Sequence, residues 1–262
     1  MIPAVGIIGY GNMGEAIAQG LVRNKLAAVH VYQTEGANKA KALKNKRLTV
    51  HDSLASLAGA CPILLIAVKP QIVPEVLEQL KPLARGRSFI SVAAGLSTAT
   101  FQKQLGDQVV RFMPNLAAKA GKSVVGVSAG AGCGEPFITQ ALAIADAVGS
   151  AVLIPERLMA AITGLSGSGI AFVFHFIHAM ALGGVREGFA YPQALSVALD
   201  TVEGAVALLR DTGEHPAAFE SRVCSPAGTT IEGVNALEHG GLTSTVIAAV
   251  SAASRRAQEL GS

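Results

Sequence analysis

The segment most able to do chemistry runs from Ser225 to Thr230 and reads Ser-Pro-Ala-Gly-Thr-Thr. Hydroxyl side chains, a proline and a glycine directly precede an apolar-periodic stretch, which is typical of a helix N-terminus. The first turn of a helix leaves backbone N–H groups unpaired at the positive end of its dipole, and hydroxyls can add donors. Ser225, Ala227, Gly228, Thr229 and Thr230 therefore predict a site for a carboxylate or a phosphate.

A second candidate anion site lies near the N-terminus, in Gly9-x-Gly11-x-x-Gly14. An apolar run precedes it and apolar residues at helical spacing follow it, which predicts a strand, a glycine turn and a helix. There the first glycine permits the turn, the second admits a diphosphate, and the third allows close packing. We expect Gly9, Gly11, Asn12, Met13 and Gly14 to bind a nucleotide, the alternative being a purely structural turn.

The next predicted strand indicates which nucleotide is bound. It ends near Gln33 and Thr34, where an Asp or Glu would bind the ribose 2′-hydroxyl of NAD; both residues are neutral, and Glu35 comes one or two positions late. The helix after this strand carries a basic cluster of Lys39, Lys41, Lys44, Lys46 and Arg47. We expect Lys39 to assist a 2′-phosphate and the others to be solvated. The cofactor is thus expected to be NADPH, with NADH possible.

Three more loops follow predicted strands and are expected to border the cofactor, because ligands of open α/β sheets lie outside the carboxyl ends of the strands. Their residues are Ala67, Val68, Lys69 and Pro70, then Ala93 and Ala94, and then Met113, Pro114 and Asn115, the last three of which are also expected to bind the substrate. Structural alternatives remain open: Pro70 can simply begin a helix, and the turn at Ala93 can be merely compact. Lys69 is interpreted as a cation near the cofactor phosphates rather than a proton donor.

The order of predicted elements divides the 262 residues near Ile154-Pro155. Before this point, strands expected near 4–8, 29–32, 63–68, 89–92, 109–113, 124–127 and 151–154 alternate with helices. This alternation predicts an α/β domain over residues 1–154, with a Rossmann-like, doubly wound, mainly parallel sheet. Beyond it, helical stretches at 157–188, 192–211, 215–222 and 229–260 predict an all-α domain over residues 155–262.

Composition narrows the class of protein. Half of the residues are apolar and only 15% are charged, which indicates extensive burial, including at a subunit interface. A net charge of +3 is too small to indicate nucleic-acid binding. Cys61, Cys133 and Cys224 are odd in number and include no C-x-x-C pair, so the chain is expected to be cytoplasmic, without disulfides or zinc.

The stretch from Leu158 to Val185 lacks Asp, Glu, Lys and Arg and is long enough to cross a bilayer. It contains a Ser-Gly-Ser-Gly segment and two histidines but no Trp or Tyr anchors, so a helix buried in an oligomer core is favoured over a membrane span. His175 and His178 are expected to be core or interface residues, not metal ligands.

Taken together, the motifs resemble the pyrroline-5-carboxylate reductase family, in order and over essentially the whole chain. They are Gly9–Gly14, Ala67–Gln71, Met113–Asn115, Leu165–Gly169 and, most specifically, Val223–Glu232. The resemblance implies reduction of 1-pyrroline-5-carboxylate to L-proline by NADPH or NADH, the last step of proline biosynthesis. It also implies a helical C-terminal dimerisation domain interlocked with its partner's, and further assembly of dimers into rings as large as a decamer.

Several residues depart from the family pattern, and Ala227 is the most important of them. The others are Leu116, Ala117, Ile170, Phe172, His178, Leu182 and Asp200. These changes concern the shape and polarity of the substrate pocket more than the fold. Ala227 stands where glycine is usual, and its methyl group narrows a turn that the ligand must approach.

A protonated C=N bond is already electrophilic, so the protein mainly has to orient the reactants. We expect backbone N–H groups around Ala227, Gly228 and Thr229 to bind the carboxylate, and the Thr230 hydroxyl to contact the ring nitrogen and steer its protonation. The alternative is that Thr229 or Thr230 is only a helix N-cap.

Other functions remain open: a related NADPH-dependent imine reductase, a hydroxyacid dehydrogenase, or a nucleotide-sensing regulatory subunit. A hydroxyacid dehydrogenase would call for a basic residue, commonly Lys, on the long helix that begins near Leu158. That helix has none up to Val185.

Overall fold

The computed structural model describes residues 2–34 and 36–261 of the chain. Contacts between Cα atoms divide the chain into two compact units. The first unit comprises Met1–Ser168 together with Ser251–Ser262, and the second comprises Gly169–Val250.

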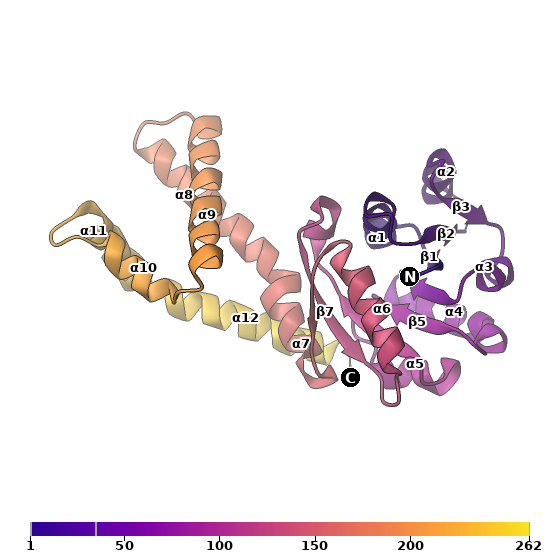
Figure 1. Cartoon of the computed structure of the whole chain (residues 1–262). Helices are drawn as coiled ribbons and strands as arrows, with labels where there is room; N and C mark the ends of the chain where they lie inside the picture. The colour runs from indigo at the N-terminus through magenta and orange to yellow at the C-terminus, as the bar shows by residue number, and fades with distance from the viewer. Residues whose placement is uncertain (1, 35, 262) are drawn as a thin grey trace. The chain divides into compact units, whose positions relative to one another are not determined.

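The first unit is built on a sheet that has eight strands in the described part of the chain, in the order β3-β2-β1-β4-β5-β6-β7-β8 (Figure 1). All neighbouring strands are parallel except β6 and β7. Their bounds are β1 Ala4–Ile8, β2 Ala28–Tyr32, β3 Thr49–His51, β4 Ile63–Ile66, β5 Ser88–Ser91, β6 Val109–Met113, β7 Ser123–Ala129 and β8 Gly149–Leu153. The predicted doubly wound, mainly parallel sheet is confirmed, and the strand order reverses between β1 and β4, where such sheets bind ligands.

Helices cover both faces of this sheet. The helices α1 (Asn12–Arg23) and α6 (Glu135–Asp146) contribute to one hydrophobic core. On the other face, α3 (Leu54–Ala60), α4 (Val73–Leu80) and α5 (Thr98–Leu105) form a second core. All four residues of β4 are buried, alternating between the two cores, as a central parallel strand requires.

Shorter helices complete the first unit. They are α2 (Ala37–Lys44), α7 (Met159–Ile162) and the 3₁₀ turns η1 (Pro70–Ile72), η2 (Lys81–Leu83), η3 (Leu116–Ala120) and η4 (Glu156–Leu158). Pro70 thus begins a short 3₁₀ helix, which agrees with the structural alternative that this proline simply starts a helix.

The second unit is helical. It contains α8 (Gly169–Arg186), α9 (Tyr191–Thr212), α10 (Pro216–Val223), α11 (Thr229–His239) and the start of α12 (Leu242–Glu259). The helices α8 and α9 approach closely, since a Cβ atom on Gly184 would lie 2.9 Å from the Cβ of Ala194. The all-α architecture predicted for the C-terminal part is confirmed.

Two helices that were predicted to be continuous are broken, so these predictions are wrong. The stretch 157–188 contains a π-helix over Thr163–Ser168, where glycines alternate with hydroxyl residues and the Thr163 hydroxyl donates to the Met159 carbonyl at 2.7 Å. The stretch 229–260 breaks at Gly241, which has φ +72°. The edge strand β3 was not predicted, because its three residues give too short a pattern.

The apolar face of α8 is open within the single chain. The exposed fractions of Val173, Phe174 and Leu182 are 47%, 54% and 50%. By length and composition alone, Glu156–Arg186 could cross a membrane, and it is the one such stretch among the described residues. Apolar area of this extent needs a covering surface.

Candidate active site

In the glycine turn after β1, two of the three glycines are required because a side chain would collide with neighbouring backbone atoms. Gly9 has φ +95°, and a Cβ atom there would lie 2.8 Å from the Ala67 carbonyl oxygen. A Cβ atom on Gly14 would lie 2.0 Å from the Gly9 oxygen. At Gly11, by contrast, a Cβ atom would meet no described atom within 4 Å. The first and third glycines are thus required by the fold, and the second faces open space that a ligand can enter.

The N-terminus of α1 is available to an anion. Gly11 is its N-cap, and no side chain in the described part of the chain caps it. The N–H groups of the first turn therefore point into the open space beside Gly11 without a side-chain acceptor. This is the arrangement with which dinucleotide-binding folds hold a diphosphate.

Gln33 is tied to this turn. Its side-chain oxygen accepts the Tyr10 N–H at 2.7 Å, and its amide nitrogen donates to the Thr34 hydroxyl at 3.2 Å. Gln33 therefore holds the glycine turn against the end of β2 and presents no negative charge to a ribose. Glu35, which the sequence placed slightly too late for this role, lies outside the described residues.

A cleft of about 410 Å³ opens between the ends of β1, β2 and β4. Predicted cofactor residues from all three strand ends line it: Gly9, Gly11, Gln33, Thr34, Ala67, Val68 and Lys69. Sequence reasoning missed Asn38, Leu54, Ile72, Glu75, Val76 and Gln79, which also line it. They lie on helices that reach the cleft only through the packing of the sheet, so no local pattern marks them.

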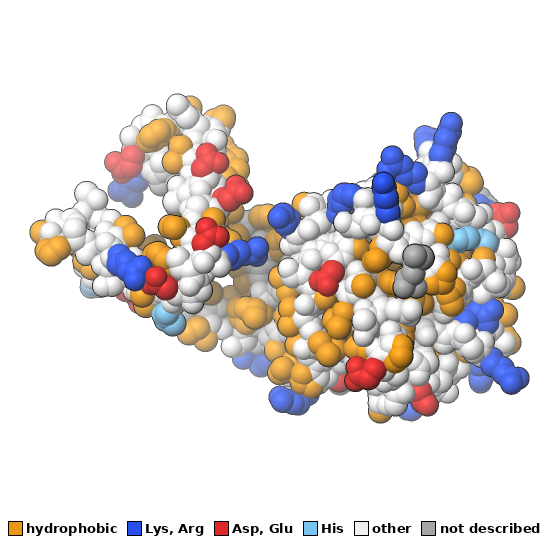
Figure 2. All heavy atoms as spheres, in the orientation of Figure 1, with side chains coloured by type: hydrophobic (Ala, Val, Ile, Leu, Met, Phe, Trp, Pro, Cys, Tyr) orange, Lys and Arg blue, Asp and Glu red, His pale blue; other side chains and the backbone are white. Residues whose placement is uncertain are grey.

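Lys39 does not line this cleft. Its ammonium nitrogen lies 3.2 Å from Asp52 Oδ1, and only 16% of its side chain is exposed. Lys41, expected to be solvated, pairs with Glu15 in the first turn of α1 at 2.5 Å. Figure 2 shows basic side chains gathered around α2, the helix that also contributes Asn38 to the lining of the cleft.

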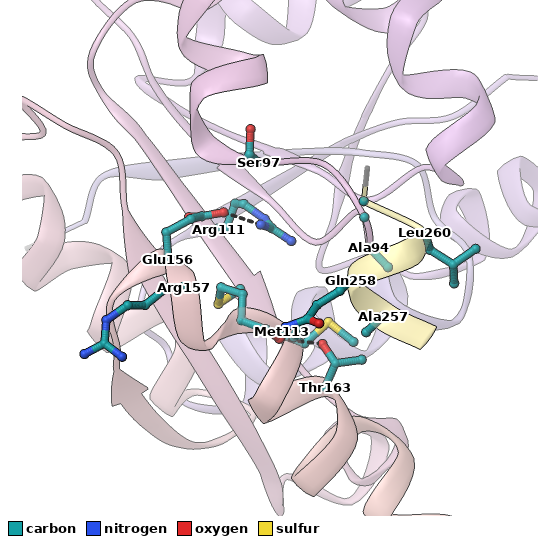
Figure 3. A pocket seen from close by; sticks show the side chains of 14 residues that line it. Ala94, Ser97, Arg111, Met113, Glu156, Arg157, Thr163, Ala257, Gln258 and Leu260 are labelled. Atoms are coloured by element: carbon teal, nitrogen blue, oxygen red, sulfur yellow. Dashed lines mark hydrogen bonds and ion pairs between the residues drawn. The ribbon is translucent and has the colours of Figure 1, made fainter. Parts of the chain in front are cut away.

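A second pocket, the Arg111 pocket, adjoins the ends of β5 and β6 and has a volume of about 330 Å³ (Figure 3). Its lining includes Ala94, Gly95, Ser97, Arg111, Met113, Glu156, Thr163, the final turn of α12 at Ala257 and Gln258, and Leu260 just after that helix. It thus contains Ala94 and Met113 of the predicted loops, whereas Ala93 is buried and is not part of the lining.

A partly buried ion pair contributes to the lining of the Arg111 pocket. Arg111 pairs with Glu156, and 10% and 32% of their side chains are exposed. The Thr98 N–H also donates to Glu156 at 3.4 Å, which ties the first turn of α5 to the pair. Sequence reasoning missed both residues, although an arginine inside the apolar run Val109–Met113 was a usable signal.

Asn115 joins the β6 loop to the Ser-Gly-Ser-Gly turn. Its side-chain oxygen accepts the Ala117 N–H at 3.0 Å, and its amide nitrogen donates to the carbonyl and hydroxyl of Ser166 at 3.2 and 3.1 Å. Pro114 beside it is buried. These hydrogen bonds hold the loop after β6 in place and bring the Met113–Asn115 and Leu165–Gly169 motifs together.

The Ser225–Thr230 segment lies in the second unit and begins α11. Gly228 is the N-cap, and among the described residues no side chain caps this helix, so the alternative that Thr229 or Thr230 is the N-cap is wrong. The Gly228 N–H donates to the Ser225 carbonyl at 3.0 Å, closing a turn. Ala227 within it has φ +56°, a left-handed conformation that favours glycine.

The remaining reactive side chains take no part in either pocket. Burial raises the pKa of Cys61 to about 11 and raises that of Cys133, so these thiols are poor nucleophiles. His178 contacts the Tyr191 hydroxyl at 2.9 Å. Within the described ranges, no group of three or more His, Cys, Asp or Glu side chains could hold a metal ion.

The fold and these pockets define an NAD(P)H-dependent oxidoreductase with a helical dimerisation region. Residues 4–95 match the family model described as NADP oxidoreductase, coenzyme F420-dependent, and residues 156–260 match that for pyrroline-5-carboxylate reductase dimerisation. The chain is 41% identical to a pyrroline-5-carboxylate reductase of Methanosarcina acetivorans over 98% of its own length and 97% of the relative's. It belongs to the pyrroline-5-carboxylate reductase family.

Solved structures agree with this assignment. A pyrroline-5-carboxylate reductase from Coxiella burnetii is 28% identical, covers 100% of both chains and superposes with a TM-score of 0.93. A pyrroline carboxylate reductase of Plasmodium falciparum, solved with NADP bound, is 27% identical with a TM-score of 0.88, over 100% of this chain and 98% of the other. The match to the dimerisation model indicates a homo-oligomer, in which a second subunit can cover the open apolar face of α8.

Proposed function

We propose that this protein reduces 1-pyrroline-5-carboxylate to L-proline. A hydride from NADPH or NADH adds to the carbon of the C=N bond, and a proton goes to the ring nitrogen, leaving NAD(P)⁺ and the amine. The observation that carries the proposal is the uncapped N-terminus of α11 behind the Ser225–Gly228 turn, in a chain of this family. The cofactor supplies the hydride, so the protein has to bind and orient.

The carboxylate of the substrate is bound at the start of α11. The N–H groups of Thr229 and Thr230 lie at the positive end of this helix, where a negative charge is stabilised, whereas the Gly228 N–H donates to the Ser225 carbonyl and shapes the turn. Ser225 supports the turn through its carbonyl, and its hydroxyl is close to Gly228: a Cβ atom added to Gly228 would lie 2.2 Å from Ser225 Oγ. Ala227 lies in the same turn and has a left-handed backbone conformation, with φ +56°.

Thr230 directs the proton to the nitrogen. Within the described part of the chain, its hydroxyl makes no hydrogen bond, so it is available to a ligand. A hydroxyl both accepts and donates, which suits contact with a protonated imine that becomes an amine. No strong general acid is needed, because the imine nitrogen takes up its proton before the hydride adds to the neighbouring carbon.

The cofactor lies along the carboxyl ends of β1, β2, β4 and β5. Gly9, Gly11, Asn12, Met13 and Gly14 bind its diphosphate, and Gln33, Thr34 and Ala67–Pro70 bind its adenosine side. Lys39, which is paired with Asp52, assists the 2′-phosphate of NADPH. Ala93 and Ala94 border the nicotinamide side, and Met113, Pro114 and Asn115 bind the substrate beside it. NADPH is preferred because Gln33 and Thr34 are neutral and α2 is basic. The open space at Gly11 and the uncapped helix support this placement.

The proposal also covers the assembly of the subunits and the location of the enzyme. Residues 1–154 form the nucleotide-binding domain, and residues 155–262 form the substrate-binding and dimerisation domain, supported by the dimerisation match over 156–260. Two subunits interlock through their helical domains, and dimers assemble further, up to a decamer. The enzyme is cytoplasmic and acts on a small molecule, not on nucleic acid or at a membrane.

One experiment tests the reaction and the site together. The purified protein is supplied with NADPH and pyrroline-5-carboxylate, and proline is identified by chiral chromatography. The Thr230→Ala variant keeps the helix and its N–H groups, so kcat should fall about tenfold or more while the melting temperature stays constant. NADPH oxidation without proline would exclude the reaction, and unchanged kcat and KM in Thr230→Ala would exclude the role of Thr230.

A further inference from the structure

Lys119 lies beside the cofactor-binding turn, although no motif includes it. It is in η3, and its ammonium nitrogen donates to Asn12 Oδ1 at 3.0 Å. Asn12 is the first residue of α1, so this contact places Lys119 at the N-terminus of the helix that follows the glycine turn. The two residues are 107 positions apart in the sequence.

The backbone of η3 holds Lys119 in this position. Asn115 caps the turn through its side-chain oxygen, and Gly121 ends it in a left-handed conformation with φ +69°. Ala118, the residue before Lys119, is buried in the same hydrophobic core as α1. The anchor of the side chain is therefore rigid, even though the ammonium group itself reaches solvent.

The charges around Lys119 are unfavourable without an anion. An ammonium group at the N-terminus of a helix faces the positive end of the dipole, which destabilises both. In the described part of the chain, Lys119 has no carboxylate partner, and the acidic residue in the first turn of α1, Glu15, pairs with Lys41. A diphosphate beside Gly11 would balance both positive groups at once.

We propose that Lys119 is a cofactor-binding residue that contacts the diphosphate of NADPH or NADH. The inference rests on the NAD(P)H dependence of the enzyme and adds a cation from outside the matched nucleotide-binding segment of residues 4–95. Lysine is a common phosphate ligand because its ammonium group is a compact point charge with three donors. Lys119 reaches the N-terminus of α1 from η3, the turn that follows β6, whereas the cleft is lined by residues at the ends of β1, β2 and β4.

Binding titrations with Lys119→Met test this role. Dissociation constants of NADPH, NADH, ADP and 2′-AMP are measured by fluorescence or calorimetry at low salt. We expect the first three constants to rise by a similar factor of about three to ten, because those ligands share a diphosphate. The constant of 2′-AMP, which has a 2′-phosphate and no diphosphate, should stay within about twofold. The salt dependence of NADPH binding should also become weaker.

Lys122→Met is the matched control. Lys122 lies three residues further along, its substitution changes the net charge equally, and no described hydrogen bond joins its side chain to α1. Lys119→Arg keeps the charge and should bind all four ligands like the wild type. Equal behaviour of Lys119→Met and Lys122→Met would overturn the proposal, and so would a loss confined to NADPH and 2′-AMP. The titrations need no turnover, so a failure to reduce pyrroline-5-carboxylate would count against the proposed reaction alone.

Discussion

The side-chain oxygen of Gln33 accepts the Tyr10 N–H at 2.7 Å and so joins the end of β2 to the glycine turn after β1. This hydrogen bond occupies the position from which an acidic side chain would bind the ribose of NAD. Gln33 thus both shapes the glycine turn and leaves its own position at the end of β2 without a negative charge.

Replacing Gln33 by glutamate should invert the cofactor preference. The carboxylate can still accept the Tyr10 N–H, so the turn is kept, but it repels a 2′-phosphate and can bind a 2′-hydroxyl. We expect kcat/KM for NADPH to fall about tenfold relative to that for NADH. Steady-state kinetics with both cofactors measures this ratio. An unchanged ratio in Gln33→Glu would mean that the adenosine ribose does not lie at the end of β2.

The Arg111–Glu156 pair should stabilise the first unit. Substitution of Arg111 by Met leaves a partly buried carboxylate without its partner, which should lower the free energy of unfolding by about 2–3 kcal/mol. Urea denaturation measures the change. The control is Arg222→Met, which removes the exposed Arg222–Glu214 pair and should cost less than about 1 kcal/mol. Equal losses of unfolding free energy in the two variants would show that the partial burial of the Arg111–Glu156 pair adds nothing to stability.

Ala227 should tolerate glycine and reject a β-branched residue. Its left-handed backbone costs an L-residue about 1–2 kcal/mol, while glycine avoids that strain and loses about 0.5–1 kcal/mol through its freer unfolded state. Ala227→Gly should therefore be as stable as the wild type or slightly more so. Ala227→Val should be less stable by about 1–2 kcal/mol, with a raised KM for the imine. Thermal unfolding and steady-state kinetics measure both effects, and a valine variant that matches the glycine variant would contradict the strained turn.

The pair His30 and His51 should make stability depend on pH. Their ring nitrogens lie 2.8 Å apart, and burial, together with the neighbouring His51, lowers the pKa of His30 below its ordinary value of 6.5. The unfolded chain then binds a proton more readily than the folded one, so this stability is present above about pH 6.5 and is lost as pH falls through the lowered pKa.

The variant His30→Gln removes this titration. Its urea midpoint should fall less between pH 7.5 and 5.5 than that of the wild type, whereas His239→Gln, on the exposed surface of α11, should behave like the wild type. A wild type whose midpoint is constant over this range would exclude the His30 effect.

The sequence was sufficient to predict the doubly wound sheet, the helical C-terminal region and the glycine turn, because each depends on a local pattern. Gly14 shows why such a pattern is reliable, since any side chain there would collide with Gly9. Arg111 and Lys119 could not be assigned in this way. Their partners, Glu156 and Asn12, lie 45 and 107 residues away, and only the folded chain brings them together.

The comparison of two imines tests the central claim most directly, that this enzyme binds a cyclic imine by its carboxylate. The measurement is kcat/KM with NADPH for 1-pyrroline-5-carboxylate and for 1-pyrroline, which has the same ring without the carboxylate. We expect the carboxylate to improve kcat/KM by about a hundredfold or more, since a charge-assisted contact at a helix N-terminus is worth about 1.5–3 kcal/mol and also orients the ring. Equal values for the two imines, or activity on 1-pyrroline alone, would contradict the account.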